Sequence, residues 1–200
     1  MSADGPVRVD HVPRDERVDG GAVFLDRDGV IVRNRPDYLR RPEDIEFLPG
    51  AVPALRRLTA AGRTLVIVTN QAVVGKRLIT LTQAVELHRH ITDVLTQHGV
   101  RLAASYLCPH VDTDCCPCRK PAPGMLVAAF RDRGIDAASS TMIGDALTDV
   151  EAGRRARTDT MLVLTGRGRD EAPRHRGAGK IVADLPGAVS SLLDAEERRR

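Results

Sequence analysis

The feature that most constrains this chain is an apolar segment that ends abruptly in two aspartates one residue apart. Residues 23–25 are apolar and are followed at once by Asp26, Arg27, Asp28 and Gly29. The apolar run predicts a buried strand, and Gly29 lets the backbone turn directly after it. Acids at the carboxyl end of a strand lie where open α/β sheets place their chemistry, although Asp and Gly also favour ordinary surface turns. Two carboxylates this close repel each other unless a cation or a shared proton relieves the charge.

The rest of the chain alternates short apolar strands with helical segments. Strands are predicted at residues 64–69, 105–107, 141–145 and 160–164, and helices at residues 51–58, 80–98, 123–134 and 185–193, with another helix after residue 145. This alternation implies a mostly parallel sheet that helices cover on both faces. We therefore expect an α/β protein with a three-layer, doubly wound, Rossmann-like sheet. The histidines of the helix at residues 80–98 are expected on its surface.

Length and charge narrow the organisation and the class of partner. A chain of 200 residues suffices for one well-buried domain, which we place at residues 21–194. Residues 1–20 are polar with mixed charges, which predicts a flexible N-terminal arm and no secretory signal peptide, and residues 195–200 form a basic C-terminal tail. No apolar run could span a membrane, and a net charge of +3 gives little support to nucleic-acid binding. We expect a cytoplasmic monomer that acts on a small molecule, without nucleic-acid or membrane partners.

Polar side chains at several predicted strand ends and in one loop can meet in a single crevice. Asp26, Thr69 and Asp145 stand at strand ends, and Lys120, one of three lysines in the chain, lies in a loop. Asp26 can attack phosphorus to form an aspartyl-phosphate, and Asp28 can protonate the leaving oxygen and later deprotonate water. Thr69 and nearby backbone amides can hold phosphate oxygens, whose charge Lys120 neutralises. Asp26 and Asp145 can hold a hard cation such as Mg²⁺.

These residues fall in four ordered motifs, and on these motifs the chain resembles the haloacid dehalogenase superfamily of phosphatases. The motifs are Asp26-Arg27-Asp28-Gly29-Val30, Val68-Thr69-Asn70, Arg119-Lys120-Pro121 and Gly144-Asp145-Ala146-Leu147-Thr148-Asp149. The resemblance implies that Asp26 is the nucleophile, that Asp28 is the acid and base and binds Mg²⁺ through its backbone carbonyl, and that Asp145 binds Mg²⁺. Asp149 could support the loop or bind the metal. The expected substrate-binding set near the nucleophile comprises Thr69, Asn70, Gln71, Arg119 and Lys120.

All four cysteines lie between residues 108 and 118, and three of them with a histidine offer a metal site. The candidate ligands are Cys108, His110, Cys116 and Cys118. A Cys₃His set suits a closed, tetrahedral structural Zn²⁺ site, and clustering of this kind favours a metal over disulfides in a chain without a signal peptide. Cys115 is the alternative to Cys116, which we prefer because Cys-x-Cys-Arg-Lys-Pro matches a subgroup of the superfamily. A metal in this zinc loop, residues 108–121, would brace the segment that delivers Lys120.

That subgroup contains the nearly capless heptose 1,7-bisphosphate phosphatases and histidinol-phosphate phosphatases. Their shared motifs do not separate the two substrates, so the loops at residues 33–38 and 72–77 must. Lys76 and Arg77 could hold the second phosphate of a bisphosphate, or they could be solvated loop charges. Ala146 looks more like the histidinol form. We favour hydrolysis of the C7 phosphate of the heptose bisphosphate over histidinol phosphate. A non-catalytic zinc-bearing interaction module would predict damaged acids, whereas all of them are intact.

Overall fold

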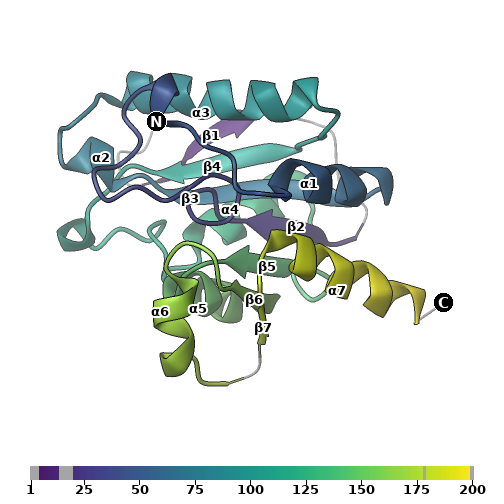
Figure 1. Ribbon diagram of the computed structural model, residues 1–200. Helices are drawn as coiled ribbons and strands as arrows, with labels where there is room; N and C mark the ends of the chain where they lie inside the picture. The colour runs from purple at the N-terminus through teal and green to yellow at the C-terminus, as the bar shows by residue number, and fades with distance from the viewer. Residues whose placement is uncertain (1–4, 14–19, 178, 199–200) are drawn as a thin grey trace.

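The computed structural model describes residues 5–13, 20–177 and 179–198, and it confirms the predicted α/β architecture (Figure 1). A seven-stranded sheet has the order β1-β4-β3-β2-β5-β6-β7, and all neighbouring strands are parallel except β1 and β4. The strands are β1 (Val7–Asp10), β2 (Ala22–Leu25), β3 (Thr64–Asn70), β4 (Ala104–Cys108), β5 (Thr141–Gly144), β6 (Asp159–Val163) and β7 (Lys180–Val182).

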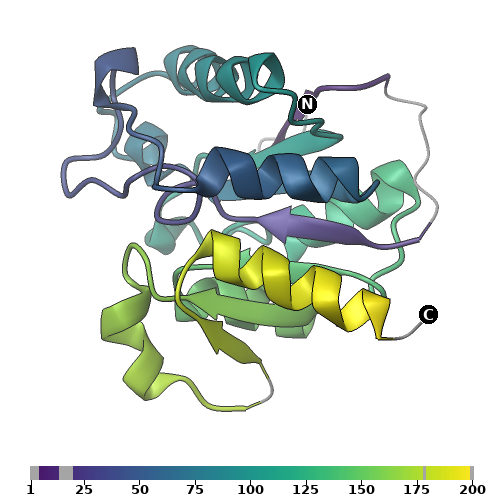
Figure 2. The same ribbon diagram turned by 45° about the vertical axis from the view of Figure 1, so that its right-hand side comes forward.

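Helices cover both faces of the sheet, which makes the three layers (Figure 2). Apolar side chains of α1, α3 and α7 pack on one face, and those of α4 and α5 pack on the other. The longer helices are α1 (Ala51–Ala60), α3 (Leu81–Gln97), α4 (Gly124–Arg133), α5 (Leu147–Arg155) and α7 (Leu185–Glu197). Shorter turns are η1 (Pro42–Asp44), α2 (Ala72–Gly75), η2 (Asp112–Asp114), α6 (Gly168–Glu171) and η3 (Ala172–Arg174). No cap domain is found in the described part of the chain.

The central strands explain why the polar residues meet. Strand β2 lies between β3 and β5, and Leu25 is in register with Ile67 of β3 and Ile143 of β5. These strands are apolar along their length because both of their faces are buried. All three are parallel, so the residues that follow these positions open on the same edge of the sheet. This edge therefore carries both Asp26 and Asp145.

The expectation of a flexible N-terminal arm is wrong for β1, which pairs antiparallel with β4 at the edge of the sheet. The segment alternates apolar and charged residues, a pattern typical of a half-buried strand. Its charged side chains find partners on α4: Arg8 forms an ion pair with Asp132 at 3.0 Å, and Asp10 pairs with the buried Arg133 at 2.6 Å. The remainder of the predicted arm, residues 1–4 and 14–19, lies outside the described residues.

Two other expectations are corrected. Helix α7 continues to Glu197 and so includes part of the predicted basic tail. His88 on α3 is fully buried, whereas the helix was expected to carry its histidines on the surface. His88 is spaced with Ala84 and Ile91 on the buried stripe of the helix, which is why it faces inward. None of the described helices is long and apolar enough to cross a membrane.

Candidate active site

Three carboxylates meet at the carboxyl edge of the sheet. Asp26 follows β2, Asp145 follows β5, and Asp149 lies in the first turn of α5; one oxygen of each lies within 4.8 Å of the others. We call these residues the acid cluster, and all three are buried. Burial and the charges of Asp26 and Asp149 raise the pKa of Asp145 to about 8. Burial also raises the pKa of Asp149 to about 6, although the nearby charge of Lys120 opposes that rise. The cluster thus concentrates negative charge that a cation would relieve.

Lys120 is the buried cation beside the acid cluster. Its ammonium nitrogen lies 2.9 Å from a carboxylate oxygen of Asp26 and 2.6 Å from one of Asp149, and it donates to the carbonyl oxygen of Val68 at 2.8 Å. Burial disfavours the charged lysine, but the two carboxylates outweigh burial and raise its pKa. Asp149 also accepts the backbone N–H of Ala146 at 3.0 Å. These contacts fit a supporting role for Asp149.

Asn70 holds the loop that carries Lys120. Its side-chain amide donates to the backbone carbonyl of Lys120 and accepts from the backbone N–H of the same residue, both at 3.0 Å. The side chain of Thr69 is buried beside it and accepts a hydrogen bond from Gln71 at 2.9 Å. The motif at the carboxyl end of β3 therefore fixes the lysine loop in addition to any contact it makes with substrate.

The loop after β6 also contacts Asp145, although the sequence motifs did not predict it as part of the site. The loop after β6 places the backbone N–H of Arg167 2.8 Å from Asp145 Oδ2. Gly166 has a φ of +53°, and a Cβ atom there would lie 2.1 Å from the same oxygen, so only glycine allows this approach. Thr165 fastens the loop by donating to the carbonyl oxygen of Gly29 at 2.6 Å. The Thr-Gly-Arg-Gly sequence was the available signal for this fifth segment of the site.

Asp28 lies at the side of the acid cluster and has partners of its own. Its carboxylate accepts two-pronged hydrogen bonds from the Arg27 guanidinium, with a shortest distance of 2.8 Å. Gln71 donates a further hydrogen bond to it at 2.9 Å. The side chain of Asp28 is 21% exposed, whereas that of Arg27 is 2% exposed. Asp28 can therefore contact a molecule in the cleft while its carboxylate is bound by the buried guanidinium of Arg27.

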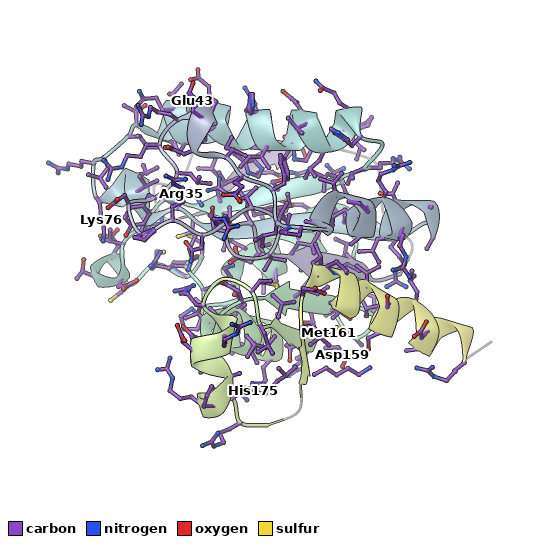
Figure 3. The ribbon with its side chains drawn as sticks, viewed as in Figure 1. Arg35, Glu43, Lys76, Asp159, Met161 and His175 are labelled. Atoms are coloured by element: carbon purple, nitrogen blue, oxygen red, sulfur yellow. The ribbon has the colours of Figure 1, made fainter. Side chains whose placement is uncertain are left out.

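A cleft of about 390 Å³ opens over these groups and brings most of the predicted residues together. Its lining includes Asp26, Arg27, Asp28, Asn70, Arg119, Lys120, Pro121, Thr148 and Asp149 from the predicted motifs, the predicted substrate-binding residue Gln71, and Asn34, Arg35, Tyr38 and Arg167 from elsewhere. Lys76 and Arg77 are not among the lining residues; the Lys76 ammonium instead lies 5.1 Å from the ring centre of Tyr38. Figure 3 shows Arg35 and Lys76 at the same end of the molecule, where the loops after β2 and β3 lie.

The zinc loop gathers the four predicted ligands into a second cluster. The thiol sulfurs of Cys108, Cys116 and Cys118 lie 3.3 to 3.6 Å from one another. The Nδ1 atom of His110 lies 3.5 Å from the sulfur of Cys108 and 3.4 Å from that of Cys118. We call these four residues the thiol cluster. Cys115 is exposed and lies outside it, whereas Cys116 is one of its members. The hydrogen bond from Cys118 lowers the pKa of the Cys108 thiol to about 5.

Arg119 joins the thiol cluster to the cleft. Its guanidinium pairs with Asp112 of η2 and donates to the carbonyl oxygen of His110 at 3.2 Å. Arg119 follows Cys118 and precedes Lys120 in the chain, and both Arg119 and Lys120 line the cleft. The order of the residues therefore couples the shape of the thiol cluster to the position of the buried lysine.

Comparison with known proteins decides the family. The HAD-hydrolase-like family model matches residues 117–188. A D-glycero-beta-D-manno-heptose-1,7-bisphosphate 7-phosphatase from Neisseria meningitidis is 33% identical over 86% of this chain and 90% of the relative. The chain belongs to the haloacid dehalogenase family of phosphatases. A D-glycero-alpha-D-manno-heptose-1,7-bisphosphate 7-phosphatase from Mycobacterium bovis is 40% identical over 64% of this chain and 69% of the relative.

A solved structure extends the likeness to the fold of this phosphatase. The crystal structure of D,D-heptose 1,7-bisphosphate phosphatase from Bordetella bronchiseptica, complexed with magnesium and phosphate, matches with a TM-score of 0.83 and 32% identity. The match covers 88% of this chain and 99% of the other. As a member of this family, the protein is a hydrolase of phosphoric monoesters. The phosphatase carries its acids, its lysine and its cationic cleft walls at the edge where the parallel strands end.

Proposed function

We propose that this phosphatase hydrolyses the C7 phosphate of D-glycero-D-manno-heptose 1,7-bisphosphate. The observation that carries the substrate is the distribution of cations in the cleft. Lys120 and Arg167 lie beside the acid cluster, with Arg167 Nε 3.9 Å from Asp145 Oδ2, whereas Arg35 and Arg119 line the cleft walls outside it. Cations beyond the reacting phosphate suit a substrate with a second phosphate. The names of the relatives support the same choice.

In the first step, Asp26 attacks phosphorus. A carboxylate oxygen of Asp26 forms a bond to phosphorus while the bond from phosphorus to the C7 oxygen breaks, which leaves an aspartyl-phosphate. Asp28 gives a proton to the departing C7 oxygen. Lys120 and the amides near Thr69 offset the charge on the phosphoryl oxygens. The sugar leaves with a free C7 hydroxyl group.

In the second step, water replaces Asp26. Asp28, now a carboxylate, takes a proton from a water molecule, whose oxygen attacks phosphorus on the aspartyl-phosphate. The bond between phosphorus and the Asp26 oxygen breaks, inorganic phosphate leaves and the free carboxylate returns. Asp28 is protonated again for the next cycle. The side-by-side placement of the two acids, one buried and one partly exposed, suits this division of work.

The acid cluster also fits a divalent metal. Asp145 Oδ1 is buried and has no hydrogen-bond partner among the described residues, while its Oδ2 accepts the Arg167 N–H. Carboxylate oxygens are preferred ligands of Mg²⁺, so Asp26 and Asp145 would hold it with the backbone carbonyl of Asp28. When bound, Mg²⁺ would neutralise the acids and the charge that develops on the transferring phosphoryl group.

We further propose that the thiol cluster binds a structural Zn²⁺. Zinc–sulfur bonds of about 2.3 Å in a tetrahedron separate the sulfurs by about 3.8 Å. The sulfurs of the cluster already stand at 3.3 to 3.6 Å, so small movements would complete the site. Four protein ligands leave no open position, so zinc would brace the zinc loop and take no part in the chemistry.

The deciding experiment is a substrate panel with Mg²⁺ present. Phosphate release is measured with the alpha and beta anomers of the heptose 1,7-bisphosphate, histidinol phosphate and an aryl phosphate, and phosphorus NMR identifies the ester that is cleaved. We expect the bisphosphate to have the highest kcat/KM and to lose its C7 phosphate. Preference for histidinol phosphate would replace this substrate, and no turnover of any ester would favour a non-catalytic module. We also propose a cytoplasmic monomer, which size-exclusion chromatography with light scattering checks for its mass.

A further inference from the structure

Arg27, which separates the two acids of the first motif, is an unusually buried cation. The residue is 1% exposed, and its guanidinium grips the carboxylate of Asp28 through Nε at 3.1 Å and Nη2 at 2.8 Å. Its remaining nitrogen, Nη1, is buried without a hydrogen-bond partner among the described residues. Burying a guanidinium is costly unless its partners compensate for the lost water. An arginine at this place therefore needs a function that a smaller or apolar residue would not perform.

The surroundings of Arg27 direct its charge toward Asp28. Among the ion pairs of the described residues, Asp28 is the one carboxylate that Arg27 contacts. His88 of α3 is fully buried, and burial together with the positive charge of Arg27 holds the pKa of His88 well below its usual value. A neutral imidazole therefore lies on the α3 side of the guanidinium. The fork of Arg27 has a single strong acceptor, and that acceptor is a predicted acid of the reaction.

Gln71 completes a three-point hold on Asp28. Its side-chain nitrogen lies 2.9 Å from Asp28 Oδ2, the oxygen that Arg27 also binds, and 2.9 Å from the hydroxyl of Thr69. The carboxylate is thus fixed from two directions by groups on the loops after β2 and β3. A planar fork fixes both position and orientation, which a lysine at the same place would not do. Asp28 keeps one partly exposed side, which faces the cleft.

We propose that Arg27, assisted by Gln71, is a positioning residue that orients Asp28 for proton transfer to the leaving oxygen. The inference rests on the proposed role of Asp28 in the mechanism and adds no contact between Arg27 and substrate. A proton delivered in the transition state matters most when the leaving oxygen is strongly basic. Loss of the hold should therefore slow esters of weakly acidic alcohols far more than esters of acidic phenols.

The test compares leaving groups in place of a single substrate. Arg27→Met and Arg27→Lys are measured on a series of aryl phosphates of graded phenol acidity and on a simple alkyl phosphate, so the result does not depend on the heptose. We expect kcat/KM of Arg27→Met to fall roughly tenfold to a hundredfold on the poorest leaving groups and by no more than about threefold on the best. Arg27→Lys, which keeps the charge without the fork, should lie between Arg27→Met and wild type.

Two further variants separate positioning from structural damage. Asp28→Asn should show the same selective loss, and adding Arg27→Met to it should cause no further loss, because both act on one proton transfer. Gln71→Leu leaves the buried cation in place and should give the same pattern more weakly, which keeps the test open if Arg27→Met fails to fold. Equal losses across the whole series, or additive losses in the double variant, would overturn the proposal.

The chain offers a matched control in the same loop. Arg33 forms a two-pronged ion pair with Glu46 at 2.7 and 2.8 Å, but it is exposed and does not line the cleft. Arg33→Met removes an arginine fork of the same kind without touching Asp28. Its dependence on the leaving group should match that of wild type. A leaving-group effect in Arg33→Met equal to that in Arg27→Met would assign the effect to the loop and overturn the role of Arg27. If no ester is hydrolysed by the wild-type protein, the proposed function fails instead.

Discussion

The acid cluster and the thiol cluster offer two metal sites of opposite character within one loop of each other. The acid cluster has three buried carboxylates beside one lysine, and an oxygen of Asp145 remains without a hydrogen-bond partner among the described residues. In the thiol cluster every sulfur faces another ligand, and no acid or lysine takes part. The first cluster carries excess charge and opens into the cleft through Asp26. The thiol cluster supplies four ligands and needs no further group to bind a metal.

This difference separates chemistry from support. A site with excess negative charge and an open side can bind a cation together with an anionic substrate, so changes there should affect turnover more than folding. A closed four-ligand site contributes folding energy, so changes there should affect stability first and turnover through it. The link between them is short, since Cys118 of the thiol cluster precedes Arg119 and Lys120. The following predictions test whether the two clusters divide the work in this way.

The largest effect is expected from Asp26→Asn. An amide cannot form the phospho-enzyme and is a weaker ligand for Mg²⁺, so turnover should be abolished on every phosphate ester. The fold should survive, because the change removes charge from an overcharged cluster and keeps the shape of the side chain. Phosphate release and thermal unfolding of the same preparation check both parts. Wild-type activity in this variant would show that another group is the nucleophile.

Cys118→Ser should damage both stability and activity. The variant removes a buried ligand that contacts Cys108 at 3.3 Å, and we expect loss of bound zinc, a lower melting temperature and a fall in kcat. Metal analysis of wild type should find about one zinc per chain, as a closed site requires.

Cys115→Ser is the matched control. Cys115 is exposed and is not among the four residues of the thiol cluster, so the variant should keep its zinc. Loss of zinc in Cys115→Ser, or full activity of zinc-free wild type, would contradict the structural role.

The sequence predicted both clusters because their members stand in recognisable places. Asp26 and Asp145 follow apolar strands, and the cysteines are paired across a short loop, so spacing alone carries the signal. Arg27 stands between two acids, and nothing in the neighbouring sequence marks it as buried. Arg167 lies in a later loop, and its approach to Asp145 depends on the packing of Gly166. Contacts that depend on which loops meet at the edge of the sheet could therefore not be predicted from the sequence.

Strand β1 and His88 were missed for a different reason, since each carried a usable pattern. Residues 7–10 alternate apolar and charged side chains, and His88 repeats with Ala84 and Ile91 at helical spacing. The charged and polar residues in these patterns suggested that both segments are exposed to solvent. In the structure they are paired or enclosed by α4 and by the N-terminal segment, as the ion pair of Asp10 with Arg133 shows. Partners distant in sequence changed the environment of residues that look exposed.

A smaller effect is expected from the cleft walls. Arg35→Ala should lower kcat/KM on the heptose bisphosphate by roughly tenfold to a hundredfold, because charge-assisted contacts contribute about 1.5–3 kcal/mol. The loss on an aryl phosphate should be smaller. Arg167→Ala removes a cation 3.9 Å from Asp145 and should lower kcat/KM on both substrates. The measurement is the ratio of kcat/KM on the two substrates.

The residues singled out in the sequence, Lys76 and Arg77, provide the comparison. Lys76→Ala should reduce the same ratio only through Tyr38, whose ring it approaches, and Arg77→Ala should reduce it least, because Arg77 does not line the cleft. A larger loss from Lys76→Ala/Arg77→Ala than from Arg35→Ala would show that the second phosphate is bound by the loop after β3. Equal losses of kcat/KM on the heptose bisphosphate and on the aryl phosphate would mean that Lys76 and Arg77 do not bind a distal phosphate.

The smallest effect, a shift in melting temperature with pH, reports directly on the charge that distinguishes the two clusters. The pKa of Asp145 is raised to about 8 in the folded protein without metal, against an ordinary value of 3.8. Between these values the folded state holds a proton that the unfolded state releases, so the free energy of unfolding falls as pH rises toward 8.

Mg²⁺ should compete with that proton, and its stabilising effect should therefore be larger at pH 8 than at pH 6. Thermal unfolding with and without Mg²⁺ at both values measures the difference. Asp145→Asn should remove most of the pH dependence of the Mg²⁺ effect, while Cys115→Ser should retain it. An effect of Mg²⁺ that does not change with pH, or that persists in Asp145→Asn, would place the cation elsewhere than the acid cluster.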